Sequence, residues 1–456
     1  MFARYREILA LPGASAFFWW GLVARMQMGM TGLATFLLIQ IEYGSYARAG
    51  AVLAAVSVGN AFLAPQVSRL IDEFGQSRVL RVGFALSVSA RTGLVVAAVM
   101  HAPLWVLLTV APLVALSGSQ STLTRARWTH IVPDKHSLNT AFSLESSLEE
   151  VLFIAGPALA TVLATTVVSW LPSMIAAVTM LIGGYAFLSL RATEPPARRA
   201  DAGTVPLTMA PVVDGALPRV GLIPESARAR IRPRRYRNPL RGHLLVTAPA
   251  LIITTVVFAT QGALFASVDA STVALAEQMG HKSWSGPVLA VFALGSLIGG
   301  LTYGARMWAG SLASRLLWGV TGSGIGAVTF AFAPNLLVLG ILMFMTGLVI
   351  APTMAVGDGM VHALISRSRL TEGMAWTRVG LDLGVASGAW LAGVLLERGG
   401  PSHGFAVTAV AGVAGIVNMA SSWKYLRRKR SYEETVVREP AVATGARDVP
   451  TGIMTS

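Results

Sequence analysis

The chain has 456 residues, of which 54% are hydrophobic and only 13% are charged, against about 25% charged residues in soluble domains. A mean hydropathy of +0.62 therefore excludes an ordinary soluble protein. The absence of cysteine excludes disulfides and thiolate metal sites, and the net charge of +14 does not indicate nucleic-acid binding, because the basic residues lie between apolar runs.

Twelve apolar runs follow one another along the chain, each long enough to cross a bilayer as a helix. This pattern predicts an all-α integral membrane protein with a six-helix bundle in residues 1–192 and another in residues 243–425. Residues 193–242 are predicted to form a cytoplasmic linker, and residues 426–456 a disordered cytoplasmic tail. The predicted spans are 14–39, 47–70, 78–100, 102–124, 140–166, 168–191, 244–268, 285–305, 313–333, 335–360, 373–396 and 404–424.

The basic residues predict how these spans are oriented. Of the 36 Lys and Arg residues, thirty lie in the segments that share a side with the N-terminus. Only Arg48, Lys282 and Arg398 lie in the segments on the opposite side. Because basic loops stay in the cytoplasm, both termini are predicted to be cytoplasmic.

The connection between the second and third spans reads SRLIDEFGQSR, from Ser68 to Arg78. Asp72 is placed where a side chain can cap a helix or pair with a basic residue. Gly75 permits a tight turn.

The fifth span carries three carboxyl groups, Glu145, Glu149 and Glu150. Each ionised carboxylate at the bilayer centre costs about 2.5–3.5 kcal/mol, and each apolar residue returns only about 0.3–0.6 kcal/mol. We expect Glu145 to be shallow and to reach the headgroups, and the other two to lie deeper on diverging faces. Arg25 is the predicted partner of the deeper pair and Arg91 the second choice. The charges either carry protons or lock the first span to the fifth.

Other charges lie inside the remaining spans. Arg378 and Asp382 are four residues apart in the eleventh span and are predicted to satisfy each other. Asp269, near the outer end of the seventh span, is interpreted as a gate or proton site, or as an interfacial residue. The predicted charge network comprises Arg25, Arg91, Glu149, Glu150, Asp269, Arg378 and Asp382.

An internal repeat relates the two halves. The segment from Leu138 aligns without a gap with the segment from Leu370, so that Gly156 meets Gly388. In the same alignment Glu150 meets Asp382, and Ala111-Pro112 resembles Ala351-Pro352 in the preceding spans. Two parallel six-span halves are predicted.

This architecture resembles the major facilitator superfamily. That family carries G-x-x-x-D-R-x-G-R-[KR] between its second and third helices; Asp72 and Gly75 match, whereas Ser68, Glu73 and Gln76 depart from the pattern. The resemblance implies a gating loop that includes Asp72, Gly75 and Arg78. Gly156-Pro157 fits the centre of the family's antiporter motif without its flanking glycines, and a proline kink is the alternative interpretation.

The resemblance implies a cavity lined by the first, fourth, seventh and tenth spans, here weakly polar and suited to an uncharged or amphipathic solute. It implies a secondary active transporter in a bacterial inner (plasma) membrane, working by alternating access as a monomer without a cofactor or metal. Proton-coupled export of a drug-like compound or small metabolite is the favoured function. The alternatives are a proton-coupled importer of a sugar or similar nutrient, a lipid-moving protein, and a non-transporting receptor or scaffold; an enzyme is not expected. The implied cavity residues are Gln27, Thr31, Thr35, Ser119, Gln120, Gln261, Thr353 and Asp358.

Overall fold

The computed structural model describes residues 2–132, 135–197, 249–306, 308, 310–364 and 370–438. All regular secondary structure in these ranges is helical, as the apolar pattern predicts. Most of the predicted linker and residues 439–456 of the predicted tail lie outside the described residues.

The N-terminal half is a bundle of six spans. It begins with a short helix, and its fourth span is divided into three pieces. Its elements are α1 (Phe2–Leu9), α2 (Ala14–Tyr43), α3 (Tyr46–Phe74), α4 (Gln76–Val99), α5 (Leu104–Val110), the 3-10 helix η1 (Ala111–Ser117), α6 (Gln120–Ile131), α7 (Lys135–Thr166), α8 (Leu171–Ser189) and the 3-10 helix η2 (Arg191–Thr193).

The C-terminal half supplies six further spans. Its last helix is interrupted at Gly399 and Gly400, whose backbone angles are not helical, so it contributes two spans and runs on to Arg438. The prediction of twelve spans is therefore confirmed for the described part of the chain. The elements are α12 (Pro249–Gln278), the 3-10 helix η3 (Lys282–Trp284), α13 (Ser285–Gly304), α14 (Leu312–Phe330), α15 (Leu336–Leu364) and α16 (Leu370–Arg438).

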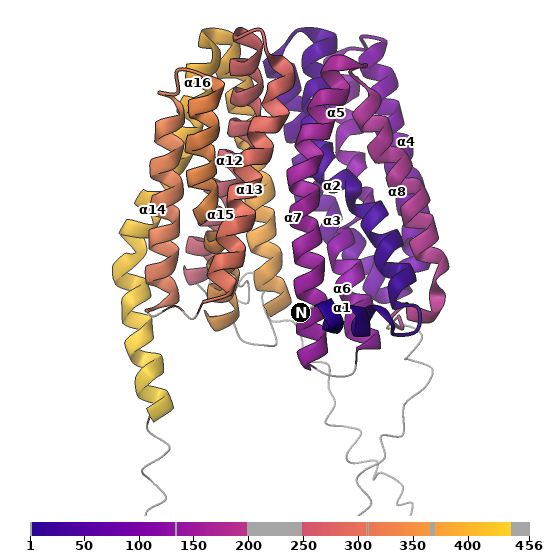
Figure 1. The fold of residues 1–456 in the computed structure, drawn as a ribbon, viewed down its shortest axis with the longest axis vertical. Helices are drawn as coiled ribbons and strands as arrows, with labels where there is room; N and C mark the ends of the chain where they lie inside the picture. The colour runs from indigo at the N-terminus through magenta and orange to yellow at the C-terminus, as the bar shows by residue number, and fades with distance from the viewer. Residues whose placement is uncertain are drawn as a thin grey trace, which may run out of the picture.

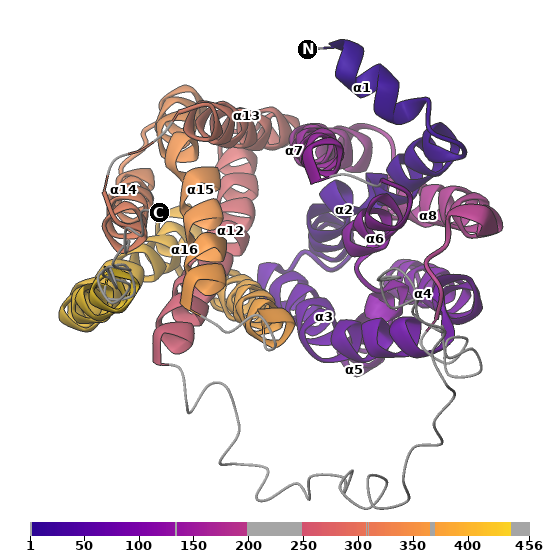
Figure 2. The same cartoon turned by 90° about the horizontal axis from the view of Figure 1, so that it is seen from below.

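The two halves stand side by side as two bundles (Figure 1). We call the end that carries α1, the C-terminal end of α8 and the start of α12 the linker end. The opposite end, which carries the α2–α3 turn, the α12–α13 connection and the interruption of α16, is the far end. Viewed from the linker end, α3 and α7 of the first half lie beside α16 and α13 of the second (Figure 2).

The fourth span differs from the continuous helix predicted over 102–124. The 3-10 helix η1 ends at Ser117, and α6 begins at Gln120. Gly118 between them has φ 65° and ψ −171°, a conformation that residues with a Cβ rarely adopt. The sequence APLVALSG is apolar enough to suggest an unbroken helix, so hydropathy alone did not reveal the break.

The two glycines that the repeat alignment matches make equivalent contacts in the two halves. In the first half, a Cβ on Gly156 of α7 would collide with the backbone of Gly29 in α2. In the second half, a Cβ on Gly388 of α16 would collide with the same backbone atoms of Ala263 in α12. The first and fifth spans of each half therefore pack backbone to backbone at equivalent positions.

A second pair of equivalent contacts joins the first and third spans of each half. Arg91 Nη2 of α4 donates to Gln27 Oε1 of α2 over 2.8 Å. In the second half, Gln261 Nε2 of α12 donates to Ser323 Oγ of α14 over 3.0 Å. The two glutamines occupy corresponding positions in the repeat. The residue that corresponds to Arg91 in the second half is therefore the neutral Ser323.

We predict that Gly299→Ala destabilises the C-terminal half. A Cβ at Gly299 of α13 would collide with the carbonyl oxygen of Leu348 in α15, and forced overpacking costs about 1–3 kcal/mol. Gly304→Ala, in the same helix with no atom near the added carbon, is the matched control. Thermal unfolding in detergent should show a lower Tm for the first variant only; equal Tm values would contradict the prediction.

Candidate functional site

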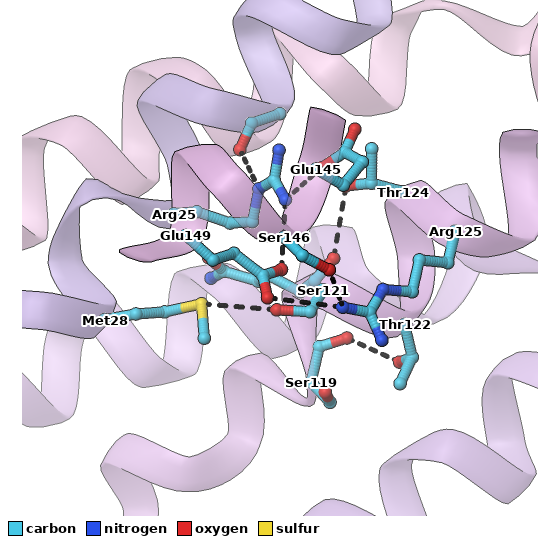
Figure 3. Close-up of polar contacts among 12 residues, drawn as sticks. Arg25, Met28, Ser119, Ser121, Thr122, Thr124, Arg125, Glu145, Ser146 and Glu149 are labelled. Carbon is cyan, nitrogen blue, oxygen red and sulfur yellow. Dashed lines mark hydrogen bonds and ion pairs between the residues drawn. The ribbon is translucent and has the colours of Figure 1, made fainter. Parts of the chain in front are cut away.

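Arg25 of α2 is the centre of a charge cluster inside the N-terminal half (Figure 3). Its side chain is completely buried. The guanidinium donates through Nε to the carbonyl oxygen of Gly21 over 3.1 Å and through Nη1 to Glu149 Oε1 over 3.1 Å. The same Nη1 forms an ion pair with Glu145. One buried cation thus contacts two carboxylates of α7, and the predicted contact between Arg25 and Glu149 is present.

Glu145 is buried at the core of this cluster, so the prediction that it reaches the headgroups is wrong. It is 0% exposed, and Trp128 Nε1 donates to its Oε1 over 2.7 Å. Trp128 is itself buried and packs edge-on against Phe17, with ring centroids 4.7 Å apart. Because α7 begins at Lys135, before the predicted start of the span, Glu145 lies more than two turns inside the helix.

Glu149 is the more exposed of the two carboxylates in the cluster. Its side chain is 16% exposed, and its Oε2 lies 3.4 Å from Nη2 of Arg125, whose side chain is 42% exposed. Arg125 Nη2 also donates to Ser146 Oγ over 3.3 Å. Glu149 therefore bridges a buried arginine and a solvent-exposed one, as Figure 3 shows.

Two other predicted members of the network lie apart from this cluster. Glu150 is half-buried and makes no ion pair with a described residue. Arg91, the second choice as a glutamate partner, bonds Gln27 instead. It is 2% exposed, and its Nε has no described partner.

The charges of the second half do not form the predicted pair. Arg378 and Asp382 do not form an ion pair with each other, although they are four residues apart on α16. The exposed Arg378 lies within electrostatic range of both Asp382 and Asp358 of α15, so it serves two carboxylates without closing on either. Arg125 of the first half is also within electrostatic range of Asp358.

The predicted span 244–268 placed Asp269 at the end of its helix, but the structure places it well inside the helix. Helix α12 continues to Gln278, more than two turns beyond Asp269. The residue is half-buried and makes no ion pair with a described residue. The sequence placed the helix end too early because the polar residues Asp269, Ser271 and Thr272 interrupt the apolar run.

The predicted cavity residues fall into two groups. Gln120 is 5% exposed, yet neither its amide nitrogen nor its amide oxygen has a described partner; it begins α6 directly after the break at Gly118. Gln27 accepts from Arg91, Gln261 donates to Ser323, and Thr353 donates to the carbonyl oxygen of Val349. Of the remaining set, Gln27, Thr35, Gln261 and Thr353 are buried, Thr31 and Asp358 are half-buried, and Ser119 is exposed.

The predicted gating loop forms a turn whose partners the sequence did not reveal. Gly75 has φ 91° and joins α3 to α4, but Asp72 and Arg78 are exposed. The carboxylate of Glu194 instead caps α4, because it accepts from the backbone N–H of Ser77 over 2.7 Å and from the Ser77 hydroxyl. Glu194 follows the last span of this half, so sequence distance hid it.

Arg127 ties the same turn to the end of α8. It donates through Nε to Gln76 Oε1 over 3.1 Å and through Nη1 to Thr193 Oγ1 over 2.9 Å. Its guanidinium lies 3.8 Å from the centre of the Phe187 ring. The sequence counted Arg127 only as a basic loop residue, whereas the structure buries it completely.

Hydrogen bonds join the two halves at the far end. Glu277 of α12 accepts from the Tyr46 hydroxyl and, over 3.0 Å, from Gln40 Nε2. Lys282 lies 3.1 Å from Glu277 and also donates to Gln40 Oε1. Glu397 of α16 accepts from the Ser45 hydroxyl and, over 3.1 Å, from the Ala47 backbone N–H. We call these contacts, centred on Glu277 and Glu397, the far-end closure.

Comparison with known proteins identifies the fold. The sequence model of the Major Facilitator Superfamily matches residues 17–321 and again 307–450. A mutant form of the nucleoside transporter NupG superposes with a TM-score of 0.65 at 12% identity, covering 89% of this chain and 98% of its own. The peptide transporter POT in complex with sulfate superposes with a TM-score of 0.59 at 15% identity, covering 92% and 95%. No curated protein sequence matches the chain.

Proposed function

This chain belongs to the Major Facilitator Superfamily and is a membrane transporter, and we propose that it couples the movement of a small organic solute to protons through Glu149. The family and the transporter folds that it resembles support transport, in place of catalysis, as the function. Proton coupling rests on the geometry of the charge cluster.

The observation that carries the proposal is the position of Glu149 between a buried and an exposed arginine. A proton on Glu149 removes its charge and weakens both ion pairs. Arg25 keeps Glu145 as its counter-ion, whereas Arg125 is released. We propose that the released Arg125 then interacts with Asp358 of the other half, so that the proton on Glu149 biases an interaction between the halves.

The internal repeat argues against a purely structural role for these charges. In the second half the first and fifth spans make the same backbone contact without any of the three charges. The residues that correspond to Arg25, Glu145 and Glu149 are Ala259, Thr377 and Leu381. Packing of these two helices therefore does not require ion pairs, and the added charges of the first half are better explained by coupling.

The far-end closure supports a conformation that faces the cytoplasm. From the distribution of basic residues we propose that the linker end faces the cytoplasm. The hydrogen bonds of Glu277 and Glu397 then close the outer side. In the cycle that we propose, breaking these contacts lets the halves rock apart on the outer side while they approach at the cytoplasmic side.

The solute site that we propose includes Gln120, since its buried amide has no described partner and can exchange hydrogen bonds with a carbonyl or hydroxyl of a solute. Discontinuous helices form such sites in other transporters. Export, with import of a nutrient as the alternative, stays a prediction. Gly156 packs against Gly29. Helix packing therefore explains the glycine of the Gly-Pro motif, and this glycine gives no evidence for the direction of transport.

Purified protein in proteoliposomes tests the proposal. The solute panel should include nucleosides, short peptides, sugars and uncharged amphipathic compounds, with a pH dye inside the vesicles. We expect at least one solute gradient to drive proton movement that protein-free vesicles lack. Solute transport that persists unchanged when an ionophore collapses the proton gradient would show that the chain transports without proton coupling.

A further inference from the structure

A cavity of about 520 Å³ opens at the far end of the C-terminal half, apart from the charge cluster. Its walls come from the end of α12, the α14–α15 connection and the interruption of α16, and Tyr46 of α3 completes it from the other half. This volume lies within the roughly 300–1,000 Å³ of ordinary small-molecule sites. The cavity is large enough for an organic molecule with an aromatic ring.

The lining of this cavity points to one kind of ligand. Glu277 is the only charged residue among the described residues that line it, and its side chain is 42% exposed. The buried Phe330 and Phe405, packed edge-on against each other, and the half-buried Tyr46 form an apolar, aromatic wall of the cavity, which suits the aromatic body of a ligand. Lys282 already presents an ammonium group to Glu277 over 3.1 Å, so a primary ammonium is chemically matched to this carboxylate.

We propose that the far-end cavity binds a primary amine with an aromatic body, and that binding at Glu277 loosens the far-end closure. The link is the shared carboxylate. Glu277 lines the cavity, and its Oε2 accepts from both Tyr46 and Gln40 of the N-terminal half, while Lys282 contacts its Oε1. An ammonium group that takes these oxygens competes with the contacts that hold the two halves together. The inference concerns binding and does not depend on proton coupling at Glu149.

Calorimetry on the full chain in lipid nanodiscs tests the binding, with 4-phenylbutylammonium as the probe and neutral 4-phenylbutanol as its control for partition into lipid. We expect saturable binding of the amine alone. Glu277→Gln should weaken it at least tenfold, which corresponds to about 1.4 kcal/mol. Glu397→Gln removes the other carboxylate of the closure but does not line the cavity, so it should bind the amine at least as tightly as the natural chain, because binding and loosening of the closure favour each other.

A second variant keeps the binding test independent of the carboxylate. Ser402 is exposed and lines the cavity, so Ser402→Phe should fill it and abolish binding while Glu277 remains. Equal binding of the amine and the alcohol would overturn the proposal. Undiminished binding in Ser402→Phe would also overturn it, because the amine would then be held outside the cavity. If Glu277→Gln does not fold, these two comparisons decide.

Distance measurements test whether binding loosens the closure. The chain has no cysteine, so spin labels can be placed at Arg48→Cys and Arg398→Cys, two exposed far-end positions in different halves. Saturating 4-phenylbutylammonium should shift the distance distribution to longer values, and the alcohol should not. An unchanged distribution at saturation would overturn the link between the cavity and the closure.

Discussion

Glu149→Gln is expected to abolish solute-driven proton movement, to the level of vesicles without protein, while the chain remains folded. The amide has nearly the shape of the carboxylate and keeps an oxygen to accept from Arg25, but it neither gains nor loses a proton. Glu149 is 16% exposed and sits at the edge of the cluster, so the substitution leaves the buried contact of Arg25 with Glu145 in place. Proton flux in proteoliposomes with an internal pH dye is the measurement.

Glu150→Gln is the matched control for this prediction. It changes the adjacent residue of the same helix in the same way, but Glu150 makes no ion pair with a described residue. We expect it to retain solute-driven proton movement. Full proton movement in Glu149→Gln would remove Glu149 from the coupling mechanism, and loss in Glu150→Gln alone would transfer the role to that residue.

The comparison between these two glutamates shows what the internal repeat reveals and what it hides. Aligning the halves singled out Glu150, because Asp382 occupies its counterpart. The structure places Glu149 in the cluster, at a position where the second half has Leu381. A repeat alignment finds what the halves share, such as the Gly156 and Gly388 contacts. A functional residue that is present in only one half, such as Glu149, lies at a position where the two halves differ, and a repeat alignment does not point to it.

The number of spans was predictable because a bilayer fixes the length of an apolar helix and the backbone must satisfy its own hydrogen bonds within it. The break at Gly118 was not predictable, because the residues before it are as apolar as those of a continuous membrane-spanning helix. The burial of Glu145 was also hidden. It depends on Trp128 and Arg25, which contact Glu145 from two other helices. A local sequence pattern does not predict contacts between separate helices.

Glu145→Leu is expected to destabilise the fold, in contrast to Glu149→Gln. Glu145 is completely buried, pairs with the buried Arg25 and accepts from Trp128. Removing the only partner of a buried charge costs about 3–5 kcal/mol. Here Arg25 keeps the partly exposed Glu149 while Trp128 Nε1 loses its acceptor, so we expect a smaller loss of about 1–3 kcal/mol. Unfolding of the purified protein in mixed micelles, followed by tryptophan fluorescence, measures the change in the free energy of unfolding.

A double variant separates the loss of a charge partner from the loss of packing. Arg25→Met together with Glu145→Leu removes both buried charges and keeps roughly the same volume, and replacing a whole buried ion pair by apolar side chains is often neutral. Glu149 keeps Arg125 as its partner. The double variant should therefore be more stable than Glu145→Leu alone, as the uncharged equivalents Ala259 and Thr377 of the second half suggest. If the losses of unfolding free energy caused by Arg25→Met and Glu145→Leu instead add up, the two side chains contribute packing and not charge compensation. Glu145 would then not be the fixed counter-ion of Arg25 that leaves Glu149 free to exchange its proton.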